Sequence, residues 1–263
     1  MRGLGIFTWF GYRIPVPERL RLIREAGFDT VMHWWDDSFA ETDGFTKEAQ
    51  AELIRREGLC IENAHLQTNQ VNDLWLDSPN GEAALARYLA DIDGLAECGI
   101  PVAVLHTTSG ICPPEMSRVG IKRFRMLADR AEQKCVKLAL ENVRHTDRLV
   151  TVLDTITSPA LGFCYDSGHD FVWSDVPYAL LARYQGRLFA VHLHDNNGQN
   201  DDHLAPGTGA IDWGIVRNGI EESSYQGAYT LEGDGAAAYP AQTPQAHLAV
   251  HYQGARAMLY GNE

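Results

Sequence analysis

The sequence predicts a single (β/α)₈ TIM barrel across residues 1–263, a typical length for one such domain. Apolar strand-like runs alternate with helix-like patterns from end to end, and no low-complexity linker divides the chain. Connections that follow strands are long, whereas those that follow helices are terse, which is typical of a barrel with functional loops at one end. An open doubly wound sheet is the alternative, but GIFTWFGY after the first strand lacks the glycine-rich phosphate loop usual there.

Four strands alternate with helices in the first half of the chain. Apolar runs predict these strands at 3–9, 28–34, 59–65 and 101–106. The helix after the first strand begins near Pro17 and ends at Gly27, residue types that favour a helix start and a C-terminal cap. Gly58 ends the next helix, 47–58. Apolar residues recur at helical spacing through 81–98, which predicts a long amphipathic helix before the fourth strand.

The second half of the chain repeats this alternation. Its strands are predicted at 137–142, 161–166, 187–195 and 228–233. Helical patterns cover 114–134, 146–156 and, at the end, 243–260. Long or aromatic loops follow the first, second, third, sixth and seventh strands, among them the loop at 34–45. Because these loops line the mouth of a barrel, we expect the function to be concentrated there.

Charge and composition restrict the partners of the protein. The net charge of −13 argues against nucleic acid or anionic lipid as a partner. No stretch approaches the ~20 apolar residues of a membrane-spanning helix, and the first residues enter a strand-like run, so we expect no signal peptide. Five cysteines without a CxxC pair favour reduced thiols and a cytoplasmic protein. Homo-oligomerisation stays open.

Four apolar runs in the second half each end in a residue that can bind a metal. These residues are Glu141, Asp166, His192 and Glu232. Side chains at the carboxyl ends of parallel barrel strands converge on one rim, so we expect them to lie together. The alternatives are salt-bridged structural carboxylates for the glutamates and a helix N-cap for Asp166. A mostly carboxylate shell suits Mn²⁺, Co²⁺ or Mg²⁺, whereas added imidazoles favour Zn²⁺.

Several histidines accompany these four residues. His169 follows Asp166 by three residues, and His194 follows His192 by two, which places the latter pair on one face of a strand. His65 and His106 also end their strands, where each is either a ligand or a hydrogen-bonding residue. The pair Asp201 and His203 lies in the loop after the seventh strand, where acidic residues are usually only solvated.

Aromatic residues and one arginine lie in or beside the predicted mouth loops. The aromatic residues are Trp9, Phe10, Tyr12, Trp34, Trp35, Trp75 and Trp173. Such rings pack against the apolar faces of sugars and screen a reactive enediolate from water, although we expect at least two of them to belong to the core. Arg13 is a candidate partner for a carboxylate or phosphate.

Together these motifs resemble the xylose isomerase-like TIM barrel superfamily, in which sugar isomerases and epimerases share a barrel with endonuclease IV (AP endonuclease family 2). The likeness covers nearly the whole chain and is specific for the superfamily rather than for one substrate. It is carried by IREAGFDTV, LALEN, GFCYDSGH, VHLHD, DDHLAPGTGAIDW and TLEGDG.

The resemblance implies a ligand set and a reaction. It implies that one divalent metal is bound by Glu141, Asp166, His192 and Glu232, and that Glu141 and Glu232 exchange the substrate proton. The phosphodiester-cleaving branch adds positions that match His65, His106, His169, Asp201 and His203. All five are present, so an additional metal near His65 and His106, or near His169, Asp201 and His203, stays open.

The sequence also departs from both branches. Ketose 3-epimerases usually follow their first glutamate with Asn-Arg-aromatic-Glu, whereas Glu141 is followed by Asn-Val-Arg-His, and their arginine six residues after the strand-seven histidine is Gly198 here. These differences argue against a free-ketohexose epimerase. The acidic charge and the mouth loops, rich in Trp and acid, argue against a protein that grips a DNA backbone.

The sequence therefore favours a divalent-metal-dependent isomerase or epimerase of a sugar or keto-sugar, acting through a metal-stabilised enediolate with Glu141 and Glu232 as acid and base. The alternatives are a keto-sugar or keto-inositol lyase or dehydratase, an endonuclease IV-like metallophosphodiesterase, and a non-catalytic binding protein. Substrate binding is assigned to His65, His106, His169, His203, Trp9, Trp34 and Arg13.

Overall fold

The computed structural model describes residues 2–38, 43–235 and 242–260, and these form the predicted (β/α)₈ barrel. Residues 39–42 of the predicted mouth loop at 34–45 lie outside the described ranges. The strands are β1 Leu4–Phe7, β2 Thr30–Trp35, β3 Cys60–Leu66, β4 Val102–His106, β5 Lys137–Glu141, β6 Leu161–Asp166, β7 Leu188–His192 and β8 Tyr229–Leu231.

All neighbouring strands run parallel, in the order β7-β6-β5-β4-β3-β2-β1-β8. Two backbone hydrogen bonds beyond the end of β7 join the outer strands. The amide of Leu193 donates to the carbonyl of Thr230 at 2.9 Å, and the amide of Glu232 donates to the carbonyl of Leu193 at 3.1 Å. These bonds close the barrel at the rim where the predicted ligands lie.

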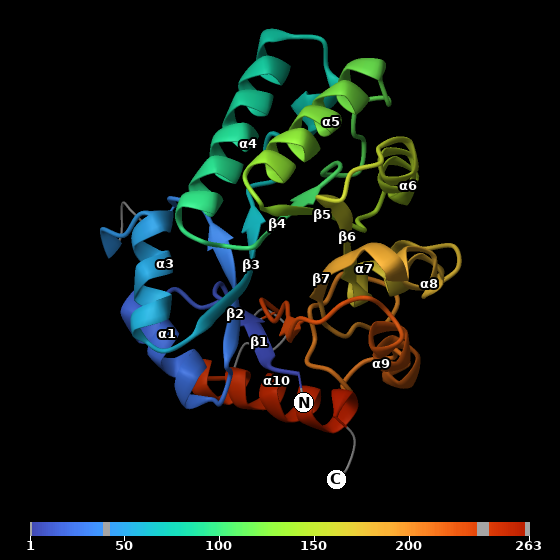
Figure 1. Ribbon diagram of the computed structural model, residues 1–263. Coiled ribbons are helices and arrows are strands. Elements are labelled where there is room, and N and C mark those ends of the chain that lie inside the picture. Colours follow the sequence, from blue (N-terminus) through green and yellow to red (C-terminus); the bar gives the residue numbers. More distant parts are fainter. Residues whose placement is uncertain (1, 39–42, 236–241, 261–263) are drawn as a thin grey trace.

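The helices surround the strands, and α10 contacts both α1 and α9 (Figure 1). Their bounds are α1 Val16–Glu25, α3 Lys47–Arg56, α4 Pro79–Glu97, α5 Arg118–Gln133, α6 Thr146–Thr155, α7 Ser167–Trp173, α8 Ala179–Tyr184, α9 Trp213–Glu221 and α10 Pro244–Leu259. Two short 3₁₀ helices, η1 Val71–Trp75 and η2 Gln185–Arg187, complete the described elements.

Side-chain caps fix where many of these helices begin. Before six of the described helices, the preceding residue accepts a hydrogen bond from a backbone amide in the first turn, which satisfies a donor that the helix itself leaves free. The capping residues are Thr46, Ser78, Ser117, Asp166, Asp212 and Thr243. Ser117 explains why α5 starts at Arg118, later than the expected residue 114.

Small side chains fill the barrel directly beneath the predicted ligands. Ala139, Cys164 and Ala190 are buried two residues before Glu141, Asp166 and His192, so they face the same side of their strands. Larger apolar residues form the core between the sheet and the helices. The narrow interior therefore leaves the polar side chains at the carboxyl ends of the strands as the floor of the barrel mouth.

Candidate metal centre

Strand register brings the predicted ligands together. His106 pairs with Glu141 across β4 and β5, and Asp166 pairs with His192 across β6 and β7. Because these residues are neighbours on adjacent strands and face the same side, their side chains meet in the barrel mouth. Candidate ligand atoms of Glu141, Asp166, His192 and Glu232 all lie within 4.8 Å of one another, and all four residues are buried.

The two glutamates approach the same atom of His192. Its Nδ1 lies 3.3 Å from Oε2 of Glu141 and 3.3 Å from Oε2 of Glu232. His65 and His106 reach Glu141 from β3 and β4, with Nε2 at 3.2 and 3.4 Å from its Oε2. Oε2 of Glu141 therefore contacts His192 as well as the pair His65 and His106.

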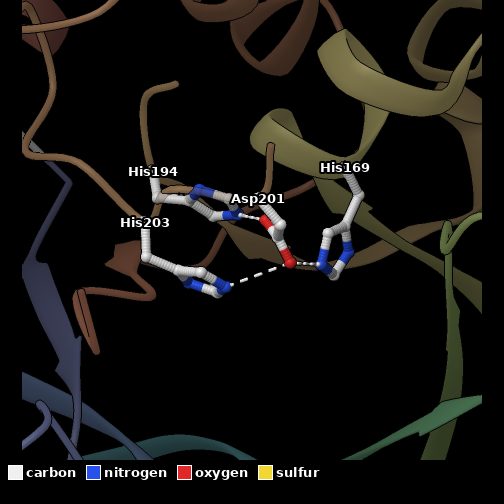
Figure 2. A group of neighbouring side chains, drawn as sticks. All are labelled: His169, His194, Asp201 and His203. Carbon is white, nitrogen blue, oxygen red and sulfur yellow. Dashed lines mark hydrogen bonds and ion pairs between the residues drawn. The ribbon is translucent and has the colours of Figure 1, made fainter. Parts of the chain in front are cut away.

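A second group forms around Asp201, in the loop after β7. His194 and the neighbouring His203 stack with their ring centroids 4.1 Å apart. Figure 2 shows the Asp201 carboxylate between His194 and His203 on one side and His169 on the other. Its Oδ2 lies 3.1 Å from Nε2 of His169 and 3.2 Å from Nε2 of His203, and its Oδ1 lies 3.6 Å from Nε2 of His194.

Hydrogen bonds to backbone carbonyls orient three of these imidazoles. Nδ1 of His65 bonds to the carbonyl of Leu66 at 2.8 Å, and Nδ1 of His203 bonds to the carbonyl of Glu232 at 3.0 Å. Nδ1 of His169 likewise lies 3.0 Å from the carbonyl of Asn142. With that proton donated to a carbonyl, each imidazole in its neutral form could offer the Nε2 lone pair to a metal held beside the neighbouring carboxylates.

In His192 the two ring nitrogens have exchanged roles, so that Nε2 is hydrogen-bonded and Nδ1 faces the carboxylates. Its Nε2 lies 3.3 Å from Oδ1 of Asn63, which accepts the proton and leaves Nδ1 facing the two glutamates. Asn63 is fully buried on β3, two residues before His65 and on the same face. Asn63 is not among the site residues predicted from the sequence. The one sequence feature that points to it is an amide side chain within a strand, on the same face as His65.

The donor set fits a divalent metal. Both carboxylate oxygens of Glu141, Oδ2 of Asp166 and Oε2 of Glu232 are buried without a hydrogen-bond partner of suitable geometry among the described residues. Buried carboxylate oxygens without partners are costly unless a cation compensates them. Oxygen ligands with one imidazole suit Mn²⁺ or Mg²⁺, and the three imidazoles around Asp201 suit Zn²⁺ better.

Without a cation, the histidines serve as the positive partners of the carboxylates. Burial would raise the pKa of Glu141, but His192 and His106 outweigh burial and hold that pKa well below its usual range. Burial would lower the pKa of His169, and the charges of Asp166 and Asp201 raise it instead. A metal and these protons would compete for the same atoms, so a metal that binds here would release protons.

Asp166 combines the two roles that the sequence analysis treated as alternatives. Its Oδ1 accepts a hydrogen bond from the amide of His169 at 2.6 Å and so caps α7, while Oδ2 remains within the ligand group. The side chain of Asn142 bonds to both the amide and the carbonyl of Asp166 at 2.8 Å. The cap and this amide pair fix the carboxylate in place.

Of the other predicted substrate-binding residues, Trp34 contacts a histidine of the site, whereas Trp9 and Arg13 line a separate cavity. Trp34 packs against His65, with ring centroids 5.5 Å apart. Trp9 and Arg13 line a separate cavity of about 440 Å³, on which Trp34 also borders. Trp35 and Trp75 are core residues, as expected of at least two of the aromatics, and their indole nitrogens donate to Asp91 and to the carbonyl of Thr107.

Comparison with protein families identifies the wider group. A family model described as xylose isomerase-like TIM barrel matches residues 20–250. An uncharacterised protein of Sinorhizobium fredii is 28% identical over 260 residues, which covers 84% of this chain and 82% of that protein. An inosose dehydratase of Lacticaseibacillus casei is 27% identical over 145 residues, or 46% of this chain and 47% of the dehydratase.

Solved structures share the fold. An IolI protein with a bound zinc atom superposes with a TM-score of 0.77 at 17% identity, covering 98% of each chain. A D-psicose 3-epimerase in the presence of D-fructose gives a TM-score of 0.74 at 14% identity, covering 99% of this chain and 100% of the epimerase. Among the described residues, no helix has the length and apolar character needed to cross a membrane.

Proposed function

The chain belongs to the xylose isomerase-like TIM barrel family, and on that premise we propose that it is a divalent-metal-dependent isomerase or epimerase of a sugar or sugar derivative. The observation that carries the proposal is the placement of Glu141 and Glu232. Their carboxylates converge on Nδ1 of His192, each at 3.3 Å, from strands on different sides of the mouth. Two carboxylates that flank one position can act on opposite sides of a carbon held there.

Glu141, Asp166, His192 and Glu232 would hold the cation. A divalent cation bound by these residues supplies Lewis-acid polarisation of the substrate carbonyl and stabilises the negative charge that develops on its oxygen. Oxygens of Glu141, Asp166 and Glu232 that are buried without a hydrogen bond of suitable geometry among the described residues support this assignment.

The two glutamates would then carry the proton. One carboxylate oxygen takes the proton from the carbon beside the carbonyl, and the C–H electron pair moves to form the enediolate. The other carboxyl returns a proton to the opposite face of that carbon, which epimerises it. Return to the neighbouring carbon, with transfer between the two oxygens, isomerises the sugar instead. Trp34, which packs on His65, would help to exclude water from this reaction.

Solvent-deuterium incorporation tests the proposal. Metal-loaded protein is incubated in D₂O with D-psicose, D-tagatose, L-ribulose, an inosose and their phosphorylated counterparts, and exchange at carbon is followed by NMR. Exchange is expected with at least one of these hydroxy-ketones. Both Glu141→Gln and Glu232→Gln should abolish it, because each amide lacks the base that the exchange needs.

Glu62→Gln is the matched control. Glu62 also lies on a strand, but its carboxylate accepts a hydrogen bond from the Tyr225 hydroxyl at 2.8 Å rather than joining a ligand group. The control should keep both metal content and exchange. Persistent exchange in Glu141→Gln and Glu232→Gln, with unchanged folding by circular dichroism, would exclude proton transfer by these residues.

Two other reactions share parts of this site. The similarity to an inosose dehydratase supports dehydration of a keto-inositol as an alternative, because elimination begins with the same proton removal. Loss of water from the inosose in the deuterium assay would identify it. The approach of His65 and His106 to Glu141, together with the group around Asp201, supports a metallophosphodiesterase as a second alternative. Cleavage of a phosphodiester without exchange on any hydroxy-ketone would favour that reaction.

A further inference from the structure

A second, smaller cavity opens directly beside the ligand groups. It has a volume of about 290 Å³ and borders His106, His169 and Asp201. We call it the Arg144 pocket. Its outer lining includes Thr68, Thr108, Ser109, Arg144 and Trp173. These residues come from the loops after β3, β4 and β5 and from α7, so several mouth loops build the pocket together.

Thr108 and Ser109 line one side of the Arg144 pocket, and contacts with η1 hold their loop in place. The amide of Asn72 in η1 bonds to the backbone amide and carbonyl of Ser109 at 3.0 and 2.8 Å, and Nε1 of Trp75 donates to the carbonyl of Thr107 at 2.8 Å. Thr108, on this anchored loop, is fully buried, and its Oγ1 has no hydrogen-bond partner among the described residues. A buried hydroxyl without a partner beside a cavity is a ready donor to a ligand.

The opposite side of the pocket carries a guanidinium. Arg144 is exposed, and its guanidinium lies 4.8 Å from the centre of the Trp173 ring. Trp173 in turn stacks on His169, with ring centroids 4.7 Å apart and planes 20° apart. Among residues 2–38, 43–235 and 242–260, no carboxylate pairs with Arg144. The charge of Arg144 is therefore available to a ligand, and the contact with the Trp173 ring helps to hold the guanidinium in position.

We propose that the Arg144 pocket binds an anionic oxygen group of the substrate, a phosphate or a carboxylate. The guanidinium supplies charge and paired N–H donors, Thr108 supplies a hydroxyl donor, and the adjoining ligand groups receive the reactive end of the same molecule. The proposal rests on the proposed function and narrows its substrate class to sugar phosphates or sugar acids.

The larger cavity is a poorer anion site, although Arg13 and Arg19 both line it. Asp43 lines the same cavity, and Arg19 already donates to the carbonyl of Ile14 at 2.9 Å and lies over the Trp9 ring. Trp34, one of the residues that line that cavity, packs against His65. The Arg144 pocket, in contrast, is bordered by His169 and Asp201 of the group around Asp201, and by His106, which contacts Glu141.

Binding of three unreactive polyols tests the proposal. D-Arabitol 5-phosphate, D-arabinonate and neutral D-arabitol are titrated into the metal-loaded protein by isothermal calorimetry. None carries a ketone or aldehyde, so binding is measured without turnover. At least one anion is expected to bind about tenfold to a hundredfold more tightly than arabitol, as charge-assisted hydrogen bonds allow. The anion that binds more tightly distinguishes phosphate from carboxylate.

Two matched arginine variants locate the anion. Arg144→Gln should remove the advantage of the anion over arabitol, whereas Arg13→Gln, which removes the same charge from the other cavity, should keep it. An advantage that survives Arg144→Gln would mean that the anion binds a metal or another surface, and would overturn the proposal. Equal binding of all three polyols, or loss of the advantage in Arg13→Gln, would overturn it as well.

This outcome is separable from that of the proposed function. A selective, Arg144-dependent anion site without deuterium exchange would leave the pocket standing and reject proton transfer. Deuterium exchange on a neutral ketose that is unchanged in Arg144→Gln would support proton transfer. If the three polyols also bound equally, the same result would reject the anion site in the Arg144 pocket.

Discussion

Replacing Asn63 with leucine should weaken metal binding without changing any metal ligand. Asn63 is fully buried, and its Oδ1 accepts the proton of His192 Nε2 at 3.3 Å. That bond presents Nδ1 of His192 to Glu141 and Glu232. Leucine has nearly the shape of asparagine but no acceptor, so the imidazole loses the group that fixes its tautomer and orientation.

The size of the effect follows from that single hydrogen bond. Loss of an orienting partner of a histidine ligand costs roughly 10- to 100-fold in metal affinity. A buried N–H left without an acceptor also costs about 1–3 kcal/mol, which should lower the unfolding free energy of Asn63→Leu before any metal is added. Asn63→Asp keeps an acceptor and should bind metal at least as tightly as the unchanged protein.

Titration with Mn²⁺, followed by the electron paramagnetic resonance signal of the free ion, measures this affinity. Mn²⁺ is chosen because the group that contains His192 is rich in carboxylate oxygen. Asn72→Leu is the control, since the Asn72 amide bonds to the Ser109 backbone outside the ligand groups. Equal Mn²⁺ affinity of Asn63→Leu and the unchanged protein would refute the role given to Asn63.

Two further predictions concern the support of the site and the pH dependence of folding. A methyl group at Gly168 would collide with the ring of His194, so Gly168→Ala should lower the unfolding free energy by about 1–3 kcal/mol in thermal denaturation, whereas Gly186→Ala, with open space around it, should not. Burial lowers the pKa of His33 from 6.5 to about 4, so its contribution is complete above pH 6.5 and is lost as the pH falls towards 4. His33→Gln keeps a donor to the Lys47 carbonyl and should remove about 2 kcal/mol of the stability lost between pH 7 and pH 5 in urea titrations; an unchanged pH dependence would argue against a neutral buried His33.

The clustering of the four candidate ligands was predictable because its signal is local. An apolar run that ends in an acidic residue or a histidine indicates a buried strand and also indicates where the carboxyl end of that strand lies. Parallel strands then bring those ends to one rim, so Glu141, Asp166, His192 and Glu232 follow from four short segments. The same rule placed His65 and His106 at strand ends, and the structure brings both to Glu141.

The orienting residues could not be predicted in this way. Asn63 and His192 are 129 residues apart and meet only because β3 and β7 face each other across the barrel. No spacing within either segment records that contact. The loops raise a similar problem, because Arg13 and Arg144 both follow strands in the sequence, and only the folded loops show that Arg144 lies beside His169, across Trp173.

The position of Glu141 links all of these groups in one electrostatic unit. Its Oε2 lies near His65, His106 and His192, and its Oε1 lies 3.1 Å from Nδ1 of His169, which in turn contacts Asp201. A cation bound by Glu141, Asp166, His192 and Glu232, or one bound by the group around Asp201, therefore changes the charge that the other residues experience. Metal ions should bind here with mutual dependence rather than independently, and each one bound displaces protons that the histidines otherwise hold. The number of protons released per metal ion thus reports how far the groups act together, and it falls if Glu141 serves only one of them.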